Sequence, residues 1–241
     1  GGENSDVQMT VSTFGDTLTI GDQSVIIPGV SYENTPDSLF GTVTDINLNT
    51  YQTVKLGDQE WMTEHLKATN FSNGENISLQ TGSIDCNIPS MATINGVSYY
   101  NGHAVLDSRN ICPVGWRIPS KQDYEILLEF FGGTQESETE WSNVGEILKS
   151  TKSNGSFSWN NDGNVLFVGN NTSHLNIDAT GMMYCGNSQV YYAKEGHLFT
   201  TDQLNQSQVY LGLSAEHHNV RFIGHYGYPS NYLTPCRCVK D

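Results

Sequence analysis

Positive charge is scarce in this sequence. The 241 residues include 11 Lys and Arg against 26 Asp and Glu, which gives a formal net charge of −15. A chain this acidic is repelled by a phosphate backbone, so we expect no nucleic-acid partner. The same charge is compatible with Ca²⁺ or with neutral ligands, and by itself it favours neither.

Long apolar runs and targeting signals are also missing. No segment approaches the roughly 18 apolar residues that a membrane-spanning helix needs. The first six residues, GGENSD, are small and polar. We expect the start of an exported, mature protein whose signal peptide has been removed, and a lipoprotein that has lost its anchor cysteine is one version of this hypothesis. The alternative is the disordered terminus of a cytosolic protein.

Closely spaced cysteine pairs are absent as well. The five cysteines include no CxxC pair, the spacing that zinc sites usually show. Scattered cysteines in an acidic chain favour disulfides and an oxidising compartment, and several pairings fit the sequence equally. The cysteines are Cys86, Cys112, Cys185, Cys236 and Cys238.

Enzyme signatures are equally scarce. The chain has no GxSxG elbow, HExxH helix, P-loop or GxGxxG turn, so we assign no catalytic residue and expect no cofactor. Residues 216–218, Glu-His-His, could suggest a metal site. They fall in a polar loop between two expected strands, where adjacent side chains point apart, which favours a solvated hairpin.

A calcium site is weakly suggested by Asp45, Asn47 and Asn49, which alternate like the first ligands of a calcium loop. Thr50 and Leu56 stand where such a loop requires a Gly and a terminal acid. We therefore interpret this segment as an Asx-rich turn, and we interpret residues 160–164, NNDGN, in the same way. Calcium binding stays an open alternative for this chain, and we assign no residue as a metal ligand.

Turn residues and alternation predict many short antiparallel strands. Residues 1–40 form an expected N-terminal extension of two or three strands, followed by a main domain over 41–241. Residues 41–62 are predicted to form two strands around Gly57-Asp58, and Asn95-Gly96 predicts a second tight hairpin. The best later strands are 207–213, 219–226 and 234–240.

Two main helices complete the predicted α+β domain. The first follows Pro119, because Ser120 and Asp123 have the spacing of a capping box and Gly132-Gly133 provide a stop. Its apolar face is formed by Tyr124, Leu127, Leu128 and Phe131. The second is predicted over residues 140–149, with Trp141, Val144, Ile147 and Leu148 on its apolar side.

Two groups of residues form motifs that follow one another along the chain. The first segment contains Asp45, Asn49, Tyr51, Val54, Gly57, Trp61, Met62, Leu66 and Lys67. Later motifs contain Tyr100, Asn101, Ala104, Val105, Cys112, Pro113, Gly115, Trp116, Pro119, Ser120, Arg237, Cys238 and Val239. Taken in order, these motifs resemble the Fibrobacter succinogenes major paralogous domain family over about residues 41–241. The resemblance is loose over 134–225, and His65, Gly102 and His103 depart from the family pattern.

This resemblance implies a C-type-lectin-like fold, with a short helix near residues 100–106. In such folds an early cysteine commonly bonds the last strand, which implies a Cys112–Cys238 disulfide. Cys236 stands where the family has an apolar residue, so it is expected as a buried free thiol. Cys86–Cys185 is then the remaining pair.

The sequence and the resemblance are compatible with three functions. The family is frequent in exported and surface proteins of Bacteroidota, so the first hypothesis is an extracellular or outer-surface, non-enzymatic module that binds glycan or protein, like an adhesin. Loop tyrosines suit sugar rings but suit packing equally; they are Tyr191, Tyr192, Tyr226, Tyr228 and Tyr232. The second hypothesis is a cysteine-dependent oxidase, because residues 116–124 resemble sulfatase-modifying-factor domains. The third is a structural subunit of a surface assembly whose residues 1–40 pair with a partner.

Overall fold

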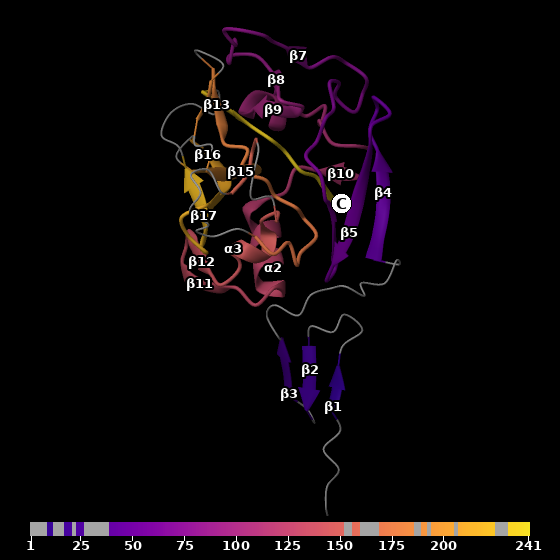
Figure 1. The fold of residues 1–241 in the computed structure, drawn as a ribbon. Helices are drawn as coiled ribbons and strands as arrows, with labels where there is room; N and C mark the ends of the chain where they lie inside the picture. Colours follow the sequence, from indigo (N-terminus) through magenta and orange to yellow (C-terminus); the bar gives the residue numbers. More distant parts are fainter. Residues whose placement is uncertain are drawn as a thin grey trace, which may run out of the picture.

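The described part of the protein combines short helices with four β-sheets, an α+β architecture (Figure 1). The computed structural model describes residues 9–11, 17–20, 23–26, 39–151, 156–159, 169–185, 189–191, 194–204, 207–224 and 231–241. Every strand pair in the sheets is antiparallel except β7–β8. The proposed turn at residues 160–164 lies outside these ranges, and so do Tyr192, Tyr226 and Tyr228.

The N-terminal extension forms its own small sheet. Its strands are β1 (Met9–Val11), β2 (Thr17–Ile20) and β3 (Gln23–Ile26), in the order β1-β2-β3. The prediction of short strands in residues 1–40 is confirmed.

A second sheet joins the two ends of the main domain, in the order β10-β19-β6-β5-β4. Its strands are β4 (Phe40–Thr44), β5 (Thr50–Leu56), β6 (Gln59–Met62), β10 (Trp116–Arg117) and β19 (Val239–Lys240). The hairpin at Gly57-Asp58 is confirmed, because Leu56 pairs with Gln59. Residues 41–62 nevertheless form parts of three strands and not the expected two, because the turn at Asp45 separates β4 from β5.

That turn is held by the Asp45 carboxylate, which is buried. Oδ1 accepts hydrogen bonds from the backbone N–H groups of Asn47 and Asn49, and Oδ2 accepts one from the Tyr51 hydroxyl at 2.6 Å. Burial and the bond to Asp45 raise the pKa of Tyr51 well above its ordinary value. The Asx-rich turn predicted for this segment is therefore confirmed.

The third sheet has the order β11-β12-β17-β16-β15. Its strands are β11 (Thr134–Ser137), β12 (Glu140–Ser142), β15 (Glu195–Leu204), β16 (Ser207–Ser214) and β17 (Val220–Gly224). The expected strands near 207–213 and 219–226 are confirmed over β16 and β17. The loop between them contains residues 216–218, as expected for a hairpin, and Lys149 donates from Nζ to the carbonyl of His217 there.

The helix predicted over residues 140–149 is wrong. Trp141 lies in β12 and pairs with Val220, and only α3 (Gly145–Leu148) is helical. Asn143, between them, has a φ of 67°, a conformation that a continuous right-handed helix cannot contain. The apolar residues of this segment are all buried, so their spacing indicated burial and not the type of element.

The fourth sheet, in the order β14-β13-β18-β9-β8-β7, contains the second predicted hairpin. Its strands are β7 (Ser78–Leu79), β8 (Ser90–Ile94), β9 (Val97–Asn101), β13 (Met182–Tyr184), β14 (Val190–Tyr191) and β18 (Tyr232–Thr234). Asn95 and Gly96, both with positive φ, form the tight turn between β8 and β9. The strand expected over 234–240 is wrong as one element, because β18 ends at Thr234 and β19 begins at Val239.

The main helix is α2 (Lys121–Phe130), and α1 (Gly102–Val105) is the short helix expected near residues 100–106. The Ser120–Asp123 capping box is confirmed, and Arg117 adds two hydrogen bonds to the Asp123 carboxylate at 2.6 and 2.9 Å. Burial opposes ionisation of Asp123, but the bonds from Arg117 and Ser120 outweigh it and lower its pKa. In the described ranges, no helix is long and apolar enough to cross a membrane.

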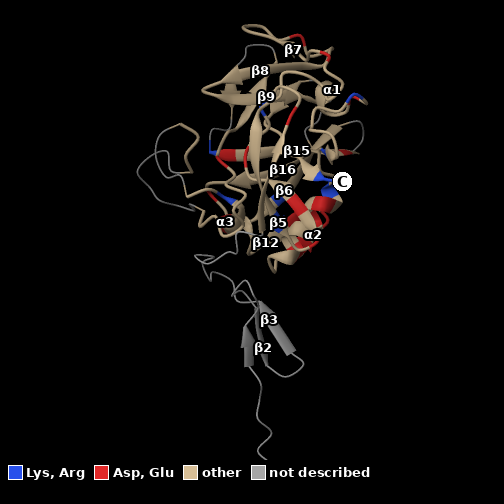
Figure 2. Cartoon of the chain, turned by 90° about the vertical axis from the view of Figure 1, so that its right-hand side faces the viewer, with Lys and Arg blue, Asp and Glu red and all other residues tan. Residues whose placement is uncertain are grey.

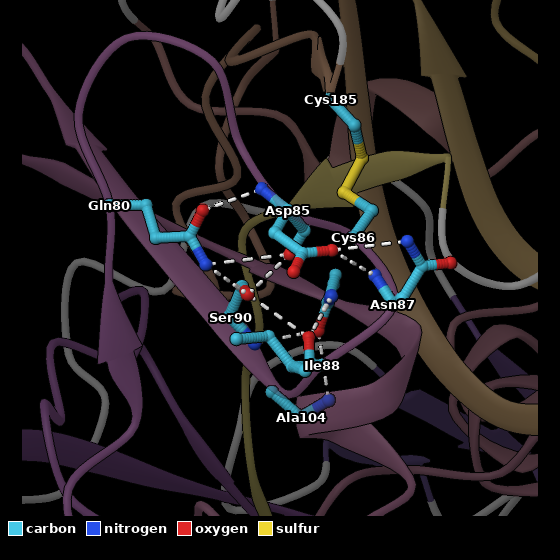
Figure 3. Close-up of a disulfide and its surroundings, with 9 residues drawn as sticks. Gln80, Asp85, Cys86, Asn87, Ile88, Ser90, Ala104 and Cys185 are labelled. Atoms are coloured by element: carbon cyan, nitrogen blue, oxygen red, sulfur yellow. Dashed lines mark hydrogen bonds between the residues drawn. A yellow bond between two sulfur atoms is a disulfide. The ribbon is translucent and has the colours of Figure 1, made fainter.

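Two disulfides tie distant segments together. Cys112 is bonded to Cys238 across 126 positions, the pair that the family resemblance implied. Cys86 is bonded to Cys185 across 99 positions, the pair expected to remain. Figure 3 shows how the second bond anchors the loop before β8, whose Asp85 donates its N–H to Gln80 and accepts at its carbonyl from Ser90. Cys236 is free and buried, as the resemblance also implied, and burial raises the pKa of its thiol.

Candidate functional site

A cavity of about 390 Å³ opens between the third sheet and the start of α2. This volume falls at the lower end of the range for small-ligand pockets, about 300 to 1,000 Å³. Its walls come from α2, the β11–β12 hairpin, β15, β16 and β17. The lining residues are Lys121, Gln135, Glu138, Thr139, Asp202, Gln203, Ser207, Val209, Phe222 and Gly224.

The floor of the cavity follows from strand alternation. Phe222 and Gly224 are two residues apart in β17, and Ser207 and Val209 are two apart in β16, so each pair faces the same side of the sheet. The register places Gly224 opposite Val209. Phe222 and Val209 supply apolar surface, and Gly224 leaves open space, since a Cβ there would meet no heavy atom within 4 Å.

One wall is set by an irregularity in β15. The pairing of β15 with β16 shifts register between Phe199 and Gln203, the kind of bulge that redirects a side chain. Asp202 lies in this irregular stretch, and its Oδ2 accepts the backbone N–H of Lys121 at 2.6 Å. A second bond, from Thr201 N to the carbonyl of Pro119 at 2.9 Å, ties the same stretch to the residues before α2.

The rim carries polar groups whose hydrogen-bonding capacity is unused. Gln135, Glu138 and Gln203 are exposed, and within the described residues their side chains form no hydrogen bond or ion pair. Lys121 differs, because its ammonium bonds Glu125 at 2.6 Å and lies 5.1 Å from the centroid of the Phe222 ring. The cavity thus combines an apolar floor with free amide and carboxylate groups, an arrangement suited to a polar ligand that has one apolar face.

Sequence reasoning missed this site. Phe222 lies in a strand that was predicted, but the β11–β12 wall was predicted partly as helix. The bulge that positions Asp202 has no local signal in the sequence. The only indication was the capping box at Ser120, which fixes where α2 begins and therefore where the Lys121 N–H points.

The structure brings together two of the tyrosines considered in the sequence, around a third that was not. Tyr184 lies opposite Tyr232 in the fourth sheet, with ring centroids 5.6 Å apart, and Tyr191 approaches Tyr184 edge-on at 6.5 Å. Tyr184 and Tyr191 are exposed, while Tyr232 is partly buried. This tyrosine cluster is a surface feature of β13, β14 and β18 and lies in a different sheet from the cavity.

In the described ranges, no three His, Cys, Asp or Glu side chains are grouped closely enough to hold a metal ion. Both carboxylate oxygens of Asp45 accept hydrogen bonds from the turn described above. Cys236 is a fully buried thiol, and Cys238 is bonded to Cys112, so these two cysteines do not form an accessible thiol pair.

Residues 54–240, more than half of the chain, match the family model of the Fibrobacter succinogenes major domain. The chain belongs to this family. Neither the curated proteins nor the solved structures gave a match.

In this Fibrobacter succinogenes major domain, the motif residues build the frame and not the cavity. Trp61, Trp116 and Cys112 are buried in the core, and Cys238 bonds the last strand to Cys112. Most cavity residues, including Phe222, fall between residues 134 and 225, where the motif resemblance is loosest. The cavity therefore lies outside the motif positions that carry the resemblance, although still within the matched residues 54–240.

Proposed function

We propose that this protein is an exported, cell-surface, non-enzymatic module that binds glycans in the cavity beside α2, in the manner of an adhesin. The observation that carries the proposal is the combination of the Phe222 and Val209 floor with the polar side chains of the rim. These side chains have no partner among the described residues; they belong to Gln135, Glu138 and Gln203. A sugar ring has an apolar face and a rim of hydroxyl groups, and this arrangement offers a counterpart to each.

Other features are compatible with the proposal. Two disulfides suit an oxidising compartment outside the cytosol. We also propose a C-type-lectin-like fold for residues 41–241, supported by the bond between Cys112 and the last strand. The oxidase alternative has no observation in its favour, because it needs an accessible thiol pair and Cys236 is buried. The three-stranded sheet of residues 9–26 leaves a structural subunit as the remaining alternative.

The experiment that tests this function is a glycan array probed with the full chain, with and without Ca²⁺. We expect binding to a defined set of glycans, independent of Ca²⁺, because the cavity offers side chains and no grouped metal ligands among the described residues. Absence of binding under both conditions would remove the glycan-binding function.

A further inference from the structure

We propose that the cavity selects its ligands by charge: it accepts neutral or amine-bearing sugar residues and excludes acidic ones. This inference rests on the proposed function, since it specifies the class of glycan that the same cavity takes. Its basis is the placement of the ionisable side chains around the apolar floor.

Two carboxylates, Asp202 and Glu138, line the cavity, and neither forms an ion pair with a described residue. Oδ2 of Asp202 accepts a hydrogen bond from the Lys121 backbone N–H, and Oδ1 accepts none within the described residues. Glu138, on the β11–β12 side, has no partner there for either oxygen. Each can accept hydrogen bonds from hydroxyl groups or from an ammonium group of a ligand.

Among the lining residues that the structure describes, Lys121 is the one cation, and it is already engaged. The Lys121 ammonium is 2.6 Å from Glu125, so it contributes little net positive charge to an incoming anion. The Phe222 ring below the ammonium further holds it in place. A ligand carboxylate would therefore approach Asp202 and Glu138 with no free cation among the described lining residues to compensate the repulsion.

The charges around the cavity also disfavour acidic ligands. Figure 2 shows acidic residues on α2, the helix that begins at the cavity, and the whole chain carries a formal charge of −15. A negative field of this kind raises the local concentration of cations and lowers that of anions. The effect on a charged ligand weakens as salt concentration rises, while a neutral ligand is unaffected by screening.

The test measures binding of three oligosaccharides by calorimetry at pH 6 and low salt: N-acetylchitotriose, its de-N-acetylated form and trigalacturonate. We expect the first two to bind and the uronate to bind at least about tenfold more weakly. The advantage of the amine form over the acetylated form should shrink in 0.5 M salt. It should also shrink in the double variant Asp202→Asn, Glu138→Gln, in which the amide introduced at position 202 keeps an oxygen for the Lys121 N–H.

Each outcome has a distinct meaning. Uronate binding as tight as that of the neutral trimer overturns the charge selection but leaves glycan binding intact. An amine-to-acetyl affinity ratio that the double variant does not change also overturns it, provided that circular dichroism shows the variant folded. Failure of all three trimers and of the glycan array removes the proposed function itself.

Discussion

The Asp202 carboxylate accepts the backbone N–H of Lys121 at 2.6 Å, and this bond joins the irregular part of β15 to the first residue of α2. The first N–H groups of a helix have no partner within the helix, so a side chain from elsewhere can satisfy one. A single contact therefore stabilises the helix and fixes a wall of the cavity.

Replacing Asp202 by Ala should lower the free energy of unfolding by about 1 kcal/mol, the usual effect of losing a capping acceptor. Gln203→Ala is the matched control, because its side chain is exposed and without a partner in the described residues, and it should cost almost nothing. Urea unfolding of both variants measures the difference. Equal stability of the two would show that the Lys121–Asp202 bond is energetically unimportant.

Asp123→Asn should destabilise the protein at pH 7 by roughly 1 kcal/mol, since Arg117 is half exposed and solvent screens the pair. The folded pKa of Asp123 lies below its ordinary 3.8, so its charge stabilises the fold above pH 4, and this contribution is lost as pH falls through the folded pKa. The stability gap between wild type and variant should therefore close on acidification.

The control for the charge change in Asp123→Asn is Glu129→Gln, an exposed position on the same helix. Denaturant unfolding at a series of pH values between 7 and 3 gives both curves. A gap between wild type and Asp123→Asn that stays constant down to pH 3 would contradict the assignment of the lowered pKa to Asp123.

The two disulfides should differ in their resistance to reduction. Cys112 and Cys238 are fully enclosed, whereas Cys86 and Cys185 are slightly more accessible. In native protein treated with dithiothreitol we expect Cys86–Cys185 to open first. Peptide mapping after alkylation follows the order, and earlier loss of Cys112–Cys238 would be inconsistent with the structure. Full loss of Cys112–Cys238 should cost roughly 5 kcal/mol in the chain-entropy estimate.

The Cys236 thiol should be unreactive in the native state. It is buried, and its raised pKa disfavours the nucleophilic thiolate. Iodoacetamide at pH 8 should label no cysteine in folded protein and one per chain after unfolding without reductant. Labelling of Cys236 in the folded protein would revive the oxidase hypothesis.

Local signals predicted the parts of this fold that local interactions create. The Ser120 capping box and the Asn95-Gly96 hairpin depend on neighbouring residues, and both occur as predicted. The structure of the segment around Trp141 does not depend on neighbouring residues alone. Its strand forms by pairing with Val220, far along the chain. Apolar spacing there is compatible with a helix or with a strand followed by a helical turn.

The candidate site was beyond prediction for a related reason. Asp202 lies where β15 is irregular in its pairing with β16, and the face of β17 that carries Phe222 becomes a cavity wall because the β11–β12 hairpin also lines that space. These are contacts between residues about 80 or more positions apart. The Cys112–Cys238 bond, equally long-range, was available from the family resemblance and not from spacing.

Filling the cavity from Gly224, in its floor, tests most directly the central claim that glycans bind in this cavity. A Cβ at Gly224 meets no heavy atom within 4 Å, so Gly224→Ala adds a methyl group in open space, while Gly224→Trp projects a large ring from the cavity face of β17. Affinity for a glycan selected on the array should be nearly unchanged in Gly224→Ala and lost in folded Gly224→Trp. Undiminished binding by Gly224→Trp would contradict the account, because the glycan would then bind elsewhere.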